Sequence, residues 1–377
     1  MRSDVLHAWS EEGHVGEFRR GPSGSVTFSY DSERRVPVSL SLPLSGGHSK
    51  RAPSAFLENL LPDDPASRRR IRGARQAEMP FLSGRGQPKF TVARMHGVWL
   101  WPDATTPSTH IIKPEVIDCP DSDLVEDAVM TLGERCGLSV ASHGIVRFDD
   151  TRAFVTERFD RRIEDGMVRR LHCEDLAQSM GISPEDKYMV DAASCVRLLR
   201  RCDPSGGLAY EWIRRCAFNV SSADCDSHGK NYSIMFDREG FGFTPMYDMT
   251  ATRVWPRLDQ ELAMPINGIE YPELLTPRDW ESFGRRTGLD GARVAAIARD
   301  MAYRVLNHVE ETASGLPANT KDRLIAAVGK ANAAIEPVDE GLASLQSPIS
   351  AGYPVGMTWV GPYERNGSTV SGYWRTR

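Results

Sequence analysis

The first part of the chain alternates apolar and polar residues over short stretches that Gly, Pro and charged residues separate. Stretches at 4–9, 14–18 and 25–30 show this alternation, which is typical of strands with one buried face. Residues 36–44 alternate in the same way but contain prolines, so an edge strand or an extended segment is expected there. With a helix at 54–61, residues 1–72 are predicted to form a small β-rich domain.

The pattern changes from strands to helices further along the chain. Strands are predicted at 90–94, 97–101, 109–113 and 152–158, with one helix near 122–136, so that residues 73–165 form a second, mainly β unit. Apolar residues spaced by three and four then predict a helical region over 166–336, with helices at 188–199, 207–219, 278–287, 291–313 and 319–335. The predicted fold class is therefore α+β.

The last segment, residues 337–377, is rich in Gly, Ser and Pro but contains several Tyr and Trp residues. Such a composition favours a flexible tail, because it buries too little apolar surface to offset the entropy of ordering. The alternative is that its aromatic side chains dock on the body of the protein or on a partner.

Composition narrows the class of protein. The 377 residues, 40% hydrophobic and 26% charged, describe an ordinary globular protein that is too long for one core. A net charge of −5 argues against broad nonspecific DNA binding by this chain alone, so any DNA contact is expected through a partner. Without an apolar run long enough to span a bilayer, or a signal-peptide core at the N-terminus, we expect a cytoplasmic location and no membrane contact. Seven cysteines without a Cys-x-x-Cys pair predict reduced thiols.

Candidate chemistry is concentrated at Asp226-Ser-His-Gly-Lys-Asn231 and, after a predicted hairpin, at Met246-Tyr-Asp248. Phosphoryl transfer by protein kinases needs an Asp that orients or accepts the substrate hydroxyl proton, an Asn five positions later and a second, downstream Asp that hold metal ions. Asp226, Asn231 and Asp248 match these roles, and their hard oxygen ligands suit Mg²⁺. His228 and Lys230 are then available to contact phosphate oxygens. The alternative is a polar surface loop made of ordinary turn residues.

Two further segments suit phosphate binding. Ser83-Gly-Arg-Gly-Gln-Pro-Lys89 contains Gly84 and Gly86, whose backbone can approach phosphate oxygens closely because no Cβ intervenes. Lys113 ends the alternating strand Thr109-His-Ile-Ile-Lys113, as does the strand lysine that contacts the α and β phosphates in kinases. By themselves, a Gly-x-Gly is more often a simple turn, and a lysine at a strand end is usually a solvated surface group.

Eight collinear motifs over residues 1–320 resemble the HipA family of bacterial toxin kinases. The motifs are Phe56-Leu-Glu-Asn-Leu-Leu-Pro62 with Arg68-Arg-Arg-Ile71, Gly86-Gln-Pro-Lys-Phe90, Thr109-His-Ile-Ile-Lys-Pro114, Glu157-Arg-Phe-Asp-Arg161, Leu171-His-Cys-Glu-Asp175, Ser183-Pro-Glu-Asp-Lys-Tyr188, the Asp226 loop and Glu261-Leu-Ala-Met264. Each motif alone is a weak signal, but their number and order make a chance match implausible.

The resemblance implies a protein-kinase-like arrangement: a β-rich N-terminal domain, a kinase-like N-lobe with a Gly-rich loop, and a mainly helical C-lobe. It implies ATP and Mg²⁺ as cofactors. The resemblance assigns nucleotide binding to Gly84, Gly86, Gln87 and Lys89 of the Gly-rich loop and to the strand lysine, Lys113. It also assigns Glu157 and Phe159 to the linker between lobes, and it places Asp160 near the ribose. Tyr247 either packs near the nucleotide or has a structural role.

The resemblance also implies a function and partners. The chain is expected to be an ATP-dependent serine/threonine protein kinase that causes growth arrest by phosphorylating an aminoacyl-tRNA synthetase or another translation component. A HipB-type helix-turn-helix antitoxin would neutralise it and carry it to operator DNA. Two alternatives remain: a small-molecule or lipid kinase, because phosphoinositide-type kinases share the loop pattern, and a catalytically weak corepressor that acts with the antitoxin.

Three positions depart from the family pattern. Leu82 occupies the best-known autophosphorylation position, and Ser83, the candidate for autophosphorylation here, is adjacent to it. Cys173 stands where the family usually has Gln, and residues 221–225 before the loop are less apolar than expected. None of these differences removes the Asp, Asn, Asp and Lys set.

Overall fold

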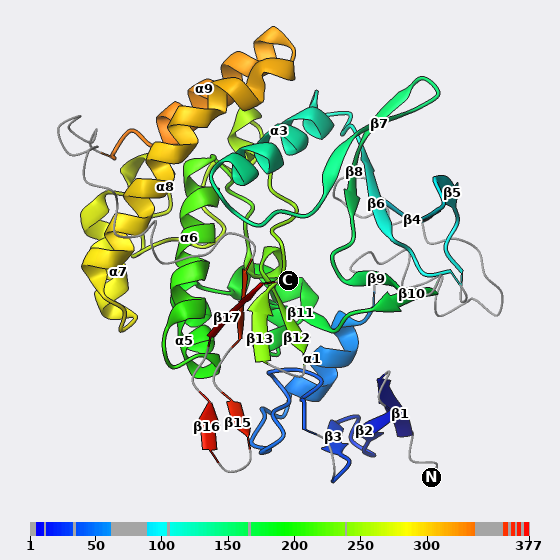
Figure 1. Cartoon of the computed structure of the whole chain (residues 1–377). Coiled ribbons are helices and arrows are strands. Elements are labelled where there is room, and N and C mark those ends of the chain that lie inside the picture. Colours follow the sequence, from blue (N-terminus) through cyan, green and yellow to red (C-terminus); the bar gives the residue numbers. More distant parts are fainter. Residues whose placement is uncertain are drawn as a thin grey trace.

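The computed structural model describes residues 5–10, 13–32, 35–61, 89–103, 106–164, 167–237 and 240–335, and the backbone of four short strands between 357 and 376. It has three main parts: a small N-terminal sheet, a five-stranded sheet beside one helix, and a helical body (Figure 1). The predicted α+β class is confirmed. Among the described residues, no helix combines the length and apolar character that crossing a membrane requires.

The N-terminal sheet is antiparallel, and its strands follow the chain order. They are β1 (Val5–Ser10), β2 (Gly13–Arg20) and β3 (Val26–Tyr30), with helix α1 (Ala52–Asn59) packed near β3. Phe18, Leu42 and Ala52 form a small core of their own. The predicted strands and helix are confirmed here. So small a core contributes little hydrophobic stabilisation, because that stabilisation scales with the apolar area removed from water.

Residues 36–44 were expected to form an edge strand or an extended segment, but they form turns and bends. The hydroxyl of Tyr30 accepts a hydrogen bond from the Val38 N–H at 2.9 Å and donates one to the Leu42 carbonyl at 2.5 Å. Pro37 and Pro43 have no N–H to give to a ladder. A single tyrosine side chain thus satisfies backbone groups that a strand would have paired.

The second sheet has the strand order β5-β4-β6-β8-β7, and all its pairs are antiparallel. Its strands are β4 (Phe90–Met95), β5 (Val98–Leu100), β6 (His110–Pro114), β7 (His143–Phe148) and β8 (Thr151–Glu157). Helix α3 (Ser122–Arg135) packs against β7 and β8 and lies between this sheet and the helical body (Figure 1). The sequence predicted four of these strands and the helix, but not β7.

The hairpin of β9 (Arg161–Glu164) and β10 (Met167–Arg170) follows the second sheet and leads to a third sheet, of order β11-β12-β13. Strand β11 (Cys173–Asp175) precedes the helices of the helical body, whereas β12 (Ser233–Asp237) and β13 (Gly240–Phe243) follow helix α6 (Gly207–Ser221). Asp175 caps the short helix α4 (Leu176–Ser179) by accepting from the Gln178 N–H. This sheet therefore joins the start of the helical body to the segment that follows the Asp226 loop.

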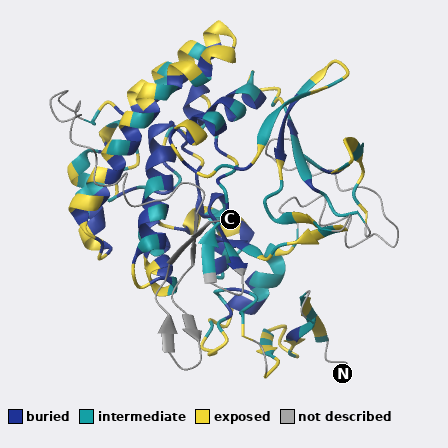
Figure 2. Cartoon of the chain, in the orientation of Figure 1, coloured by how far each residue is buried: buried dark blue, intermediate teal, exposed yellow. Residues whose placement is uncertain are grey.

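The helical body surrounds the main hydrophobic core, which Figure 2 shows as the buried faces of its helices. Its helices are α5 (Ala192–Cys202), α6 (Gly207–Ser221), α7 (Pro277–Arg286), α8 (Gly291–Thr312) and α9 (Ala318–Ala331). Short 3-10 turns connect them: η1 (Pro184–Met189), η2 (Gly229–Asn231), η3 (Thr252–Val254), η4 (Pro272–Leu274) and η5 (Ala313–Gly315). Four of the five predicted helices lie within a few residues of the observed ones.

The fifth prediction, a helix over 188–199, begins too early. Asp191 has an extended backbone, and its side chain accepts the Ser194 N–H at 2.8 Å, so that it is the N-cap of α5. An N-cap residue lies outside the helix that it starts. Tyr188 and Met189, which precede Asp191, belong to η1 instead.

The described parts of the C-terminal segment form strands, whereas the composition favoured a flexible tail. The segment contains β14 (Met357–Val360), β15 (Tyr363–Arg365), β16 (Ser368–Val370) and β17 (Tyr373–Thr376), with β14 paired to β17 and β15 to β16. The register places Trp359 opposite Trp374. Aromatic and β-branched residues favour strands, and in this segment they prevail over the surrounding Gly and Ser.

Candidate active site

The segment between α6 and β12 holds the Asp226–Asn231 motif at the surface of the helical body. Its backbone is fixed from two sides: the Cys225 N–H donates to Thr252 Oγ1 at 2.9 Å, and the Cys225 carbonyl accepts from the Ala263 N–H at 2.9 Å. Asp226 follows with an exposed side chain. The loop thus presents a carboxylate to solvent from a rigid backbone.

A tight turn at Gly229 brings the rest of the motif inward. A Cβ at this position would lie 2.8 Å from Val190 Cγ2, too close for any side chain. Glycine lets η2 pack directly on Val190, and the turn ends at Asn231, which is buried. The glycine of the motif therefore has a packing reason of its own.

Asn231 and Asp248 lie against each other, although 17 positions separate them. Asn231 Nδ2 donates to Asp248 Oδ2 at 3.2 Å and to the Asp248 carbonyl at 3.3 Å. Asn231 Oδ1 is buried and has no hydrogen-bond partner within the described part of the chain. A buried oxygen without a partner is costly, so the pair offers an amide oxygen and a carboxylate to a ligand from outside the chain.

Asp248 adopts an unusual backbone conformation, with φ of 57°. Left-handed backbone at a non-glycine residue costs free energy and is concentrated at functional sites. Its carboxylate, half exposed, forms an ion pair with Lys113 Nζ. The charge of Lys113 holds the pKa of Asp248 well below its usual range, with help from the charge of Lys89. Asp248 is therefore ionised at neutral pH.

Lys113 connects the five-stranded sheet with both Asp248 and α3. Its ammonium group is buried, and Nζ donates to Glu126 Oε1 at 2.5 Å as well as to Asp248 Oδ1. Burial alone would lower the pKa of Lys113, but the charges of Asp248 and Glu126 raise it well above its usual value. A permanent positive charge is thus held between two carboxylates at the end of β6.

Asp226 is oriented by a tyrosine from η1. The Tyr188 hydroxyl donates to Asp226 Oδ1 at 2.8 Å, and the Tyr188 ring meets the His228 ring edge to face, with 5.2 Å between centroids. Burial lowers the pKa of His228, and the charge of Lys187 lowers it further, which favours the neutral imidazole. His228 Nδ1 is buried and is also without a partner among the described residues.

Asp224, just before the motif, has a buried carboxyl group. It accepts the Asp226 N–H at 3.0 Å. Burial raises the pKa of Asp224 well above its usual range, and the charge of Asp226 adds to the effect. Asp224 thus fixes the backbone of Asp226 from inside the protein.

The side chain of Tyr247 contacts the backbone of Lys230. The Tyr247 hydroxyl donates to the Lys230 carbonyl at 2.8 Å and bonds with Ser233 Oγ at 2.6 Å. The rings of Tyr247 and Phe159 lie 5.1 Å apart. The Tyr247 hydroxyl therefore ties the Lys230 backbone to β12, and its ring contacts Phe159.

The predicted linker residues, Glu157, Phe159 and Asp160, connect the second sheet to the helical body. The Glu157 N–H donates to the Ser142 carbonyl at 2.7 Å. Asp160 is bound by two arginines, Arg158 at 2.8 Å and Arg161 at 2.6 Å; burial alone would raise the pKa of Asp160, but their hydrogen bonds and charges lower it. Asp160 is thus engaged in a structural cluster, which leaves less of its carboxylate for a ribose.

Four residues of the Gly-rich loop, Ser83, Gly84, Gly86 and Gln87, lie outside the described residues. Lys89 is described, is exposed, and acts on Asp248 through its charge. The structure therefore brings Lys113, Asn231 and Asp248 into contact, with Asp226 and His228 on the adjoining loop.

Three residues of this cluster escaped prediction: Glu126, Tyr188 and Asp224. Glu126 could have been found, because a kinase strand lysine pairs with a glutamate of the next helix, and that helix was predicted. For Asp224, the sequence shows only an acidic residue next to Cys225, which predicts no role in the site.

Cys173 of β11 is one of the positions that differ from the family pattern. It is half-buried, and burial raises the pKa of its thiol to about 12. All seven cysteines are free thiols.

The cluster has the charge pattern of a site for a metal-bound polyphosphate. Carboxylate and amide oxygens from Asp248 and Asn231 are the ligands that Mg²⁺ prefers, and the unpartnered Asn231 Oδ1 fits such an ion. The positive charges of Lys113 and Lys89 both act on Asp248. Asp226, exposed and oriented, is available to a hydroxyl group of a second molecule.

Comparison with protein families gives two matches that together span most of the chain. Residues 6–82 match the model described as HipA N-terminal domain, and residues 81–309 match the HipA-like C-terminal domain. The second match alone covers more than half of the chain.

Curated relatives and a solved structure agree with these matches. The protein named "Putative kinase Y4mE" of Sinorhizobium fredii is 26% identical, over 83% of this chain and 93% of its own length. The serine/threonine-protein kinase toxin HipA of Shewanella oneidensis is 28% identical, over 64% of this chain and 60% of its own length. A solved structure of the Shewanella oneidensis MR-1 toxin–antitoxin system, with HipA, HipB and operator DNA, superposes with a TM-score of 0.71 at 22% identity and covers 87% of this chain and 97% of that one.

Proposed function

The chain belongs to the HipA family, and from this premise we propose that it is an ATP-dependent serine/threonine protein kinase that acts as the toxin of a HipBA-type toxin–antitoxin system. The observation that supports this most directly is the position of Lys113, buried between Glu126 and Asp248, while Asp248 contacts Asn231. In protein kinases, a lysine–glutamate pair and a metal-binding Asp must both be in place for activity.

The proposed roles follow the geometry. Asp226 takes the proton of the substrate hydroxyl, and the Tyr188 hydroxyl holds its carboxylate in one orientation. Asn231 and Asp248 would hold Mg²⁺. Lys113 would contact the phosphates, with His228 and Lys230 as further contacts. Mg-ATP, when bound, supplies the phosphoryl group that the hydroxyl receives.

The other residues predicted to contact the nucleotide complete the proposed nucleotide site. The Gly-rich loop residues Gly84, Gly86, Gln87 and Lys89 would cover the phosphates, and the backbone at Glu157 and Phe159 would bond the adenine edge. The Tyr247 ring would border the base through its contact with Phe159. Asp160 would reach the ribose only if it exchanged one of its two arginine partners.

The proposed organisation has four parts: an antitoxin-binding domain at 1–72, an N-lobe at 73–165, a C-lobe at 166–336 and a C-terminal segment at 337–377. The target would be a translation component such as an aminoacyl-tRNA synthetase, and the location would be the cytoplasm. Phosphorylating such a protein would stop growth by stopping protein synthesis.

Controlled expression in a bacterial host, followed by mass spectrometry of phosphopeptides, tests this function. The wild-type chain should arrest growth and add phosphate to Ser or Thr of a translation protein, whereas Asp248→Asn, expressed at the same level, should do neither. Growth arrest of equal strength by both proteins would contradict the proposal.

The antitoxin partner has its own test. Because the chain has a net charge of −5, it should bind operator DNA only through a basic helix-turn-helix dimer, whose symmetry sets the spacing of the half-sites. Gel-shift titrations at fixed salt should show sequence-specific binding by the complex. Equal affinity of the isolated chain for the same DNA would show that the chain itself reads DNA.

A further inference from the structure

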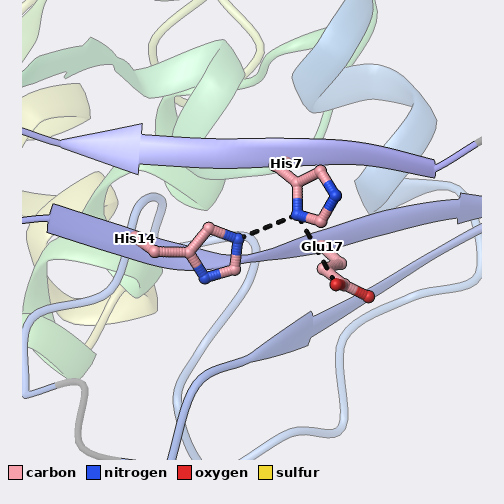
Figure 3. A group of neighbouring side chains, drawn as sticks. All are labelled: His7, His14 and Glu17. Atoms are coloured by element: carbon pink, nitrogen blue, oxygen red, sulfur yellow. Dashed lines mark hydrogen bonds and ion pairs between the residues drawn. The ribbon is translucent and has the colours of Figure 1, made fainter.

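Two histidines and a glutamate meet on the N-terminal sheet, outside the candidate active site. His7 lies on β1, and His14 and Glu17 lie on β2 (Figure 3). His7 Nδ1 is 3.1 Å from His14 Nε2 and 3.5 Å from Glu17 Oε1. One potential ligand atom from each of the three residues lies within 4.8 Å of the other two. Within the described residues this is the one such group of three potential metal ligands.

The two measured separations suit a bound metal ion. Zn²⁺ binds histidine nitrogen and carboxylate oxygen at about 2.0–2.2 Å in a tetrahedron, which places neighbouring ligand atoms roughly 3.3–3.6 Å apart. The separations of 3.1 and 3.5 Å are close to this range. Three protein ligands with a fourth position for water or another group are a common arrangement for Zn²⁺.

An irregularity in the strand pairing brings the three side chains to one face. His7 is directly opposite Glu17, but the register shifts after Ala8, so that Trp9 is opposite His14 and Val15 is the extra residue. Residues that face each other across two strands lie on the same side of the sheet. In a regular strand, His14 and Glu17, three positions apart, would lie on opposite sides. The bulge therefore creates the cluster.

The backbone around the bulge is tightly determined. Val15 is buried, and a Cβ at Gly16 would lie 2.2 Å from the Ser29 carbonyl oxygen of β3. Only glycine permits this approach of β2 to β3. The position of His14 is thus fixed by packing on the opposite face of the sheet.

A fourth residue orients His14. His14 Nδ1 is 2.7 Å from Asp31 Oδ2, just beyond the end of β3. A histidine that binds metal through one nitrogen usually donates its other N–H to a carboxylate or carbonyl, which fixes the ring and its tautomer. With Nδ1 engaged by Asp31, Nε2 is the nitrogen that faces His7 and Glu17. Arg19 pairs with Glu17 through the other carboxylate oxygen, Oε2.

We propose that His7, His14 and Glu17 bind one divalent ion of a late transition metal, with Zn²⁺ as its representative and Asp31 as the residue that positions His14. Imidazole and carboxylate ligands suit Zn²⁺, Ni²⁺ and Cu²⁺, and the site has no feature that selects strongly among them. The bound ion joins the edge strand β1 to β2, and through Asp31 to the end of β3. This cross-link stabilises a sheet whose core cluster, formed by Phe18, Leu42 and Ala52, is small.

Equilibrium dialysis of Zn²⁺ against the full chain without an affinity tag tests the proposal. Excess Mg²⁺ and the Asp248→Asn background remove competing binding at the proposed kinase site. The parent protein should bind one equivalent, His7→Ala and His14→Ala should lose it, and Asp31→Asn should bind about 10–100-fold more weakly. His96→Ala, at an exposed histidine of the β4–β5 turn, is the matched control and should bind one equivalent.

Thermal unfolding supplies a second measurement, because an ion that binds only the folded state raises the melting temperature. Zn²⁺ should raise it for the parent and for His96→Ala, and not for Glu17→Gln, a nearly isosteric change on a half-buried strand residue. One bound equivalent in both His7→Ala and His14→Ala, or equal thermal shifts in Glu17→Gln and the parent, would overturn the proposal. Absence of binding to the parent would overturn it as well.

Discussion

Lys113 of β6 and Glu126 of α3 form a buried ion pair, with 2.5 Å between Nζ and Oε1. Both side chains are almost completely inaccessible to solvent, and the lysine also contacts Asp248 of the helical body. The pair thereby fixes the sheet, the helix and Asp248 relative to one another. Removing one partner of a buried pair is more damaging than its net stabilisation suggests, because the other charge remains buried.

Glu126→Gln should lower kcat/KM for ATP-dependent transfer by about 100-fold, the effect of misplacing a catalytic group by roughly 1 Å. Glutamine retains the size of the side chain, so circular dichroism should show an intact fold. Glu134→Gln, on the same helix but half exposed, is the control and should keep wild-type rates. Equal rates for the two variants would show that Lys113 does not need its α3 partner.

Metal dependence should follow from Asn231, whose Oδ1 is buried and unpartnered among the described residues. Chelation of Mg²⁺ should abolish transfer. Asn231→Ala should raise the Mg²⁺ concentration needed for half-maximal rate by at least about tenfold, since even the loss of outer-shell partners costs that much. Asn307→Ala, an exposed asparagine of α8, should leave the requirement unchanged. An unaltered Mg²⁺ requirement in Asn231→Ala would exclude this residue as a ligand.

Glu174 of β11 should make stability depend on pH. Its Oε1 accepts from the Leu40 N–H at 2.8 Å and from Ser179 Oγ at 2.9 Å, and burial raises its pKa from 4.5 to about 7. The folded state binds this proton more tightly than the unfolded state does. The contribution of Glu174 to the free energy of unfolding is therefore fully present below pH 4.5. It declines as pH rises to 7, by up to about 1.4 kcal/mol per pH unit.

Denaturant unfolding of wild type and Glu174→Gln at several pH values measures this effect. The neutral glutamine has no proton to lose, so the stability of the variant relative to wild type should rise between pH 5 and 8. A constant difference across that range would show that Glu174 does not titrate there.

Regulation by autophosphorylation is predicted at Ser83, which lies outside the described residues. A phosphate on the Gly-rich loop would add a charge near −2 and repel the phosphates of ATP. Mass spectrometry after incubation with Mg-ATP should find phosphoserine 83, together with a falling rate of transfer. Stoichiometric phosphate at another residue, with Ser83 unmodified, would refute this.

Residues that are close in sequence, or that follow a family order, could be predicted. Lys113, Asn231 and Asp248 were recognised from spacing and motif order, and the structure brings all three together. Glu126 and Tyr188 were not, because each is an ordinary residue of its own element and acquires its partner only when α3 or η1 packs against the site. Their partners lie 13 and 38 positions away.

Strand irregularities could not be predicted from the sequence either. The His7, His14 and Glu17 cluster depends on one extra residue in β2, and regular alternation predicts that two of the three side chains point apart. Residues 36–44 alternate like a strand, yet a tyrosine hydroxyl satisfies their backbone. In both places, tertiary contacts determine the local backbone structure, which the periodicity of the sequence does not predict.

The central claim, that Asp226 is the catalytic carboxylate of a phosphotransferase, is tested most directly by transfer of radiolabelled phosphate from γ-labelled ATP. Asp226 is exposed and its replacement by Asn keeps the shape of the side chain, so the Asp226→Asn protein should fold normally. Asp118→Asn, an exposed aspartate outside the site, is the matched control. The account predicts that Asp226→Asn transfers phosphate roughly 10²–10⁴-fold more slowly than wild type and Asp118→Asn, the range expected for loss of a general base. Transfer at the wild-type rate by Asp226→Asn would contradict the account.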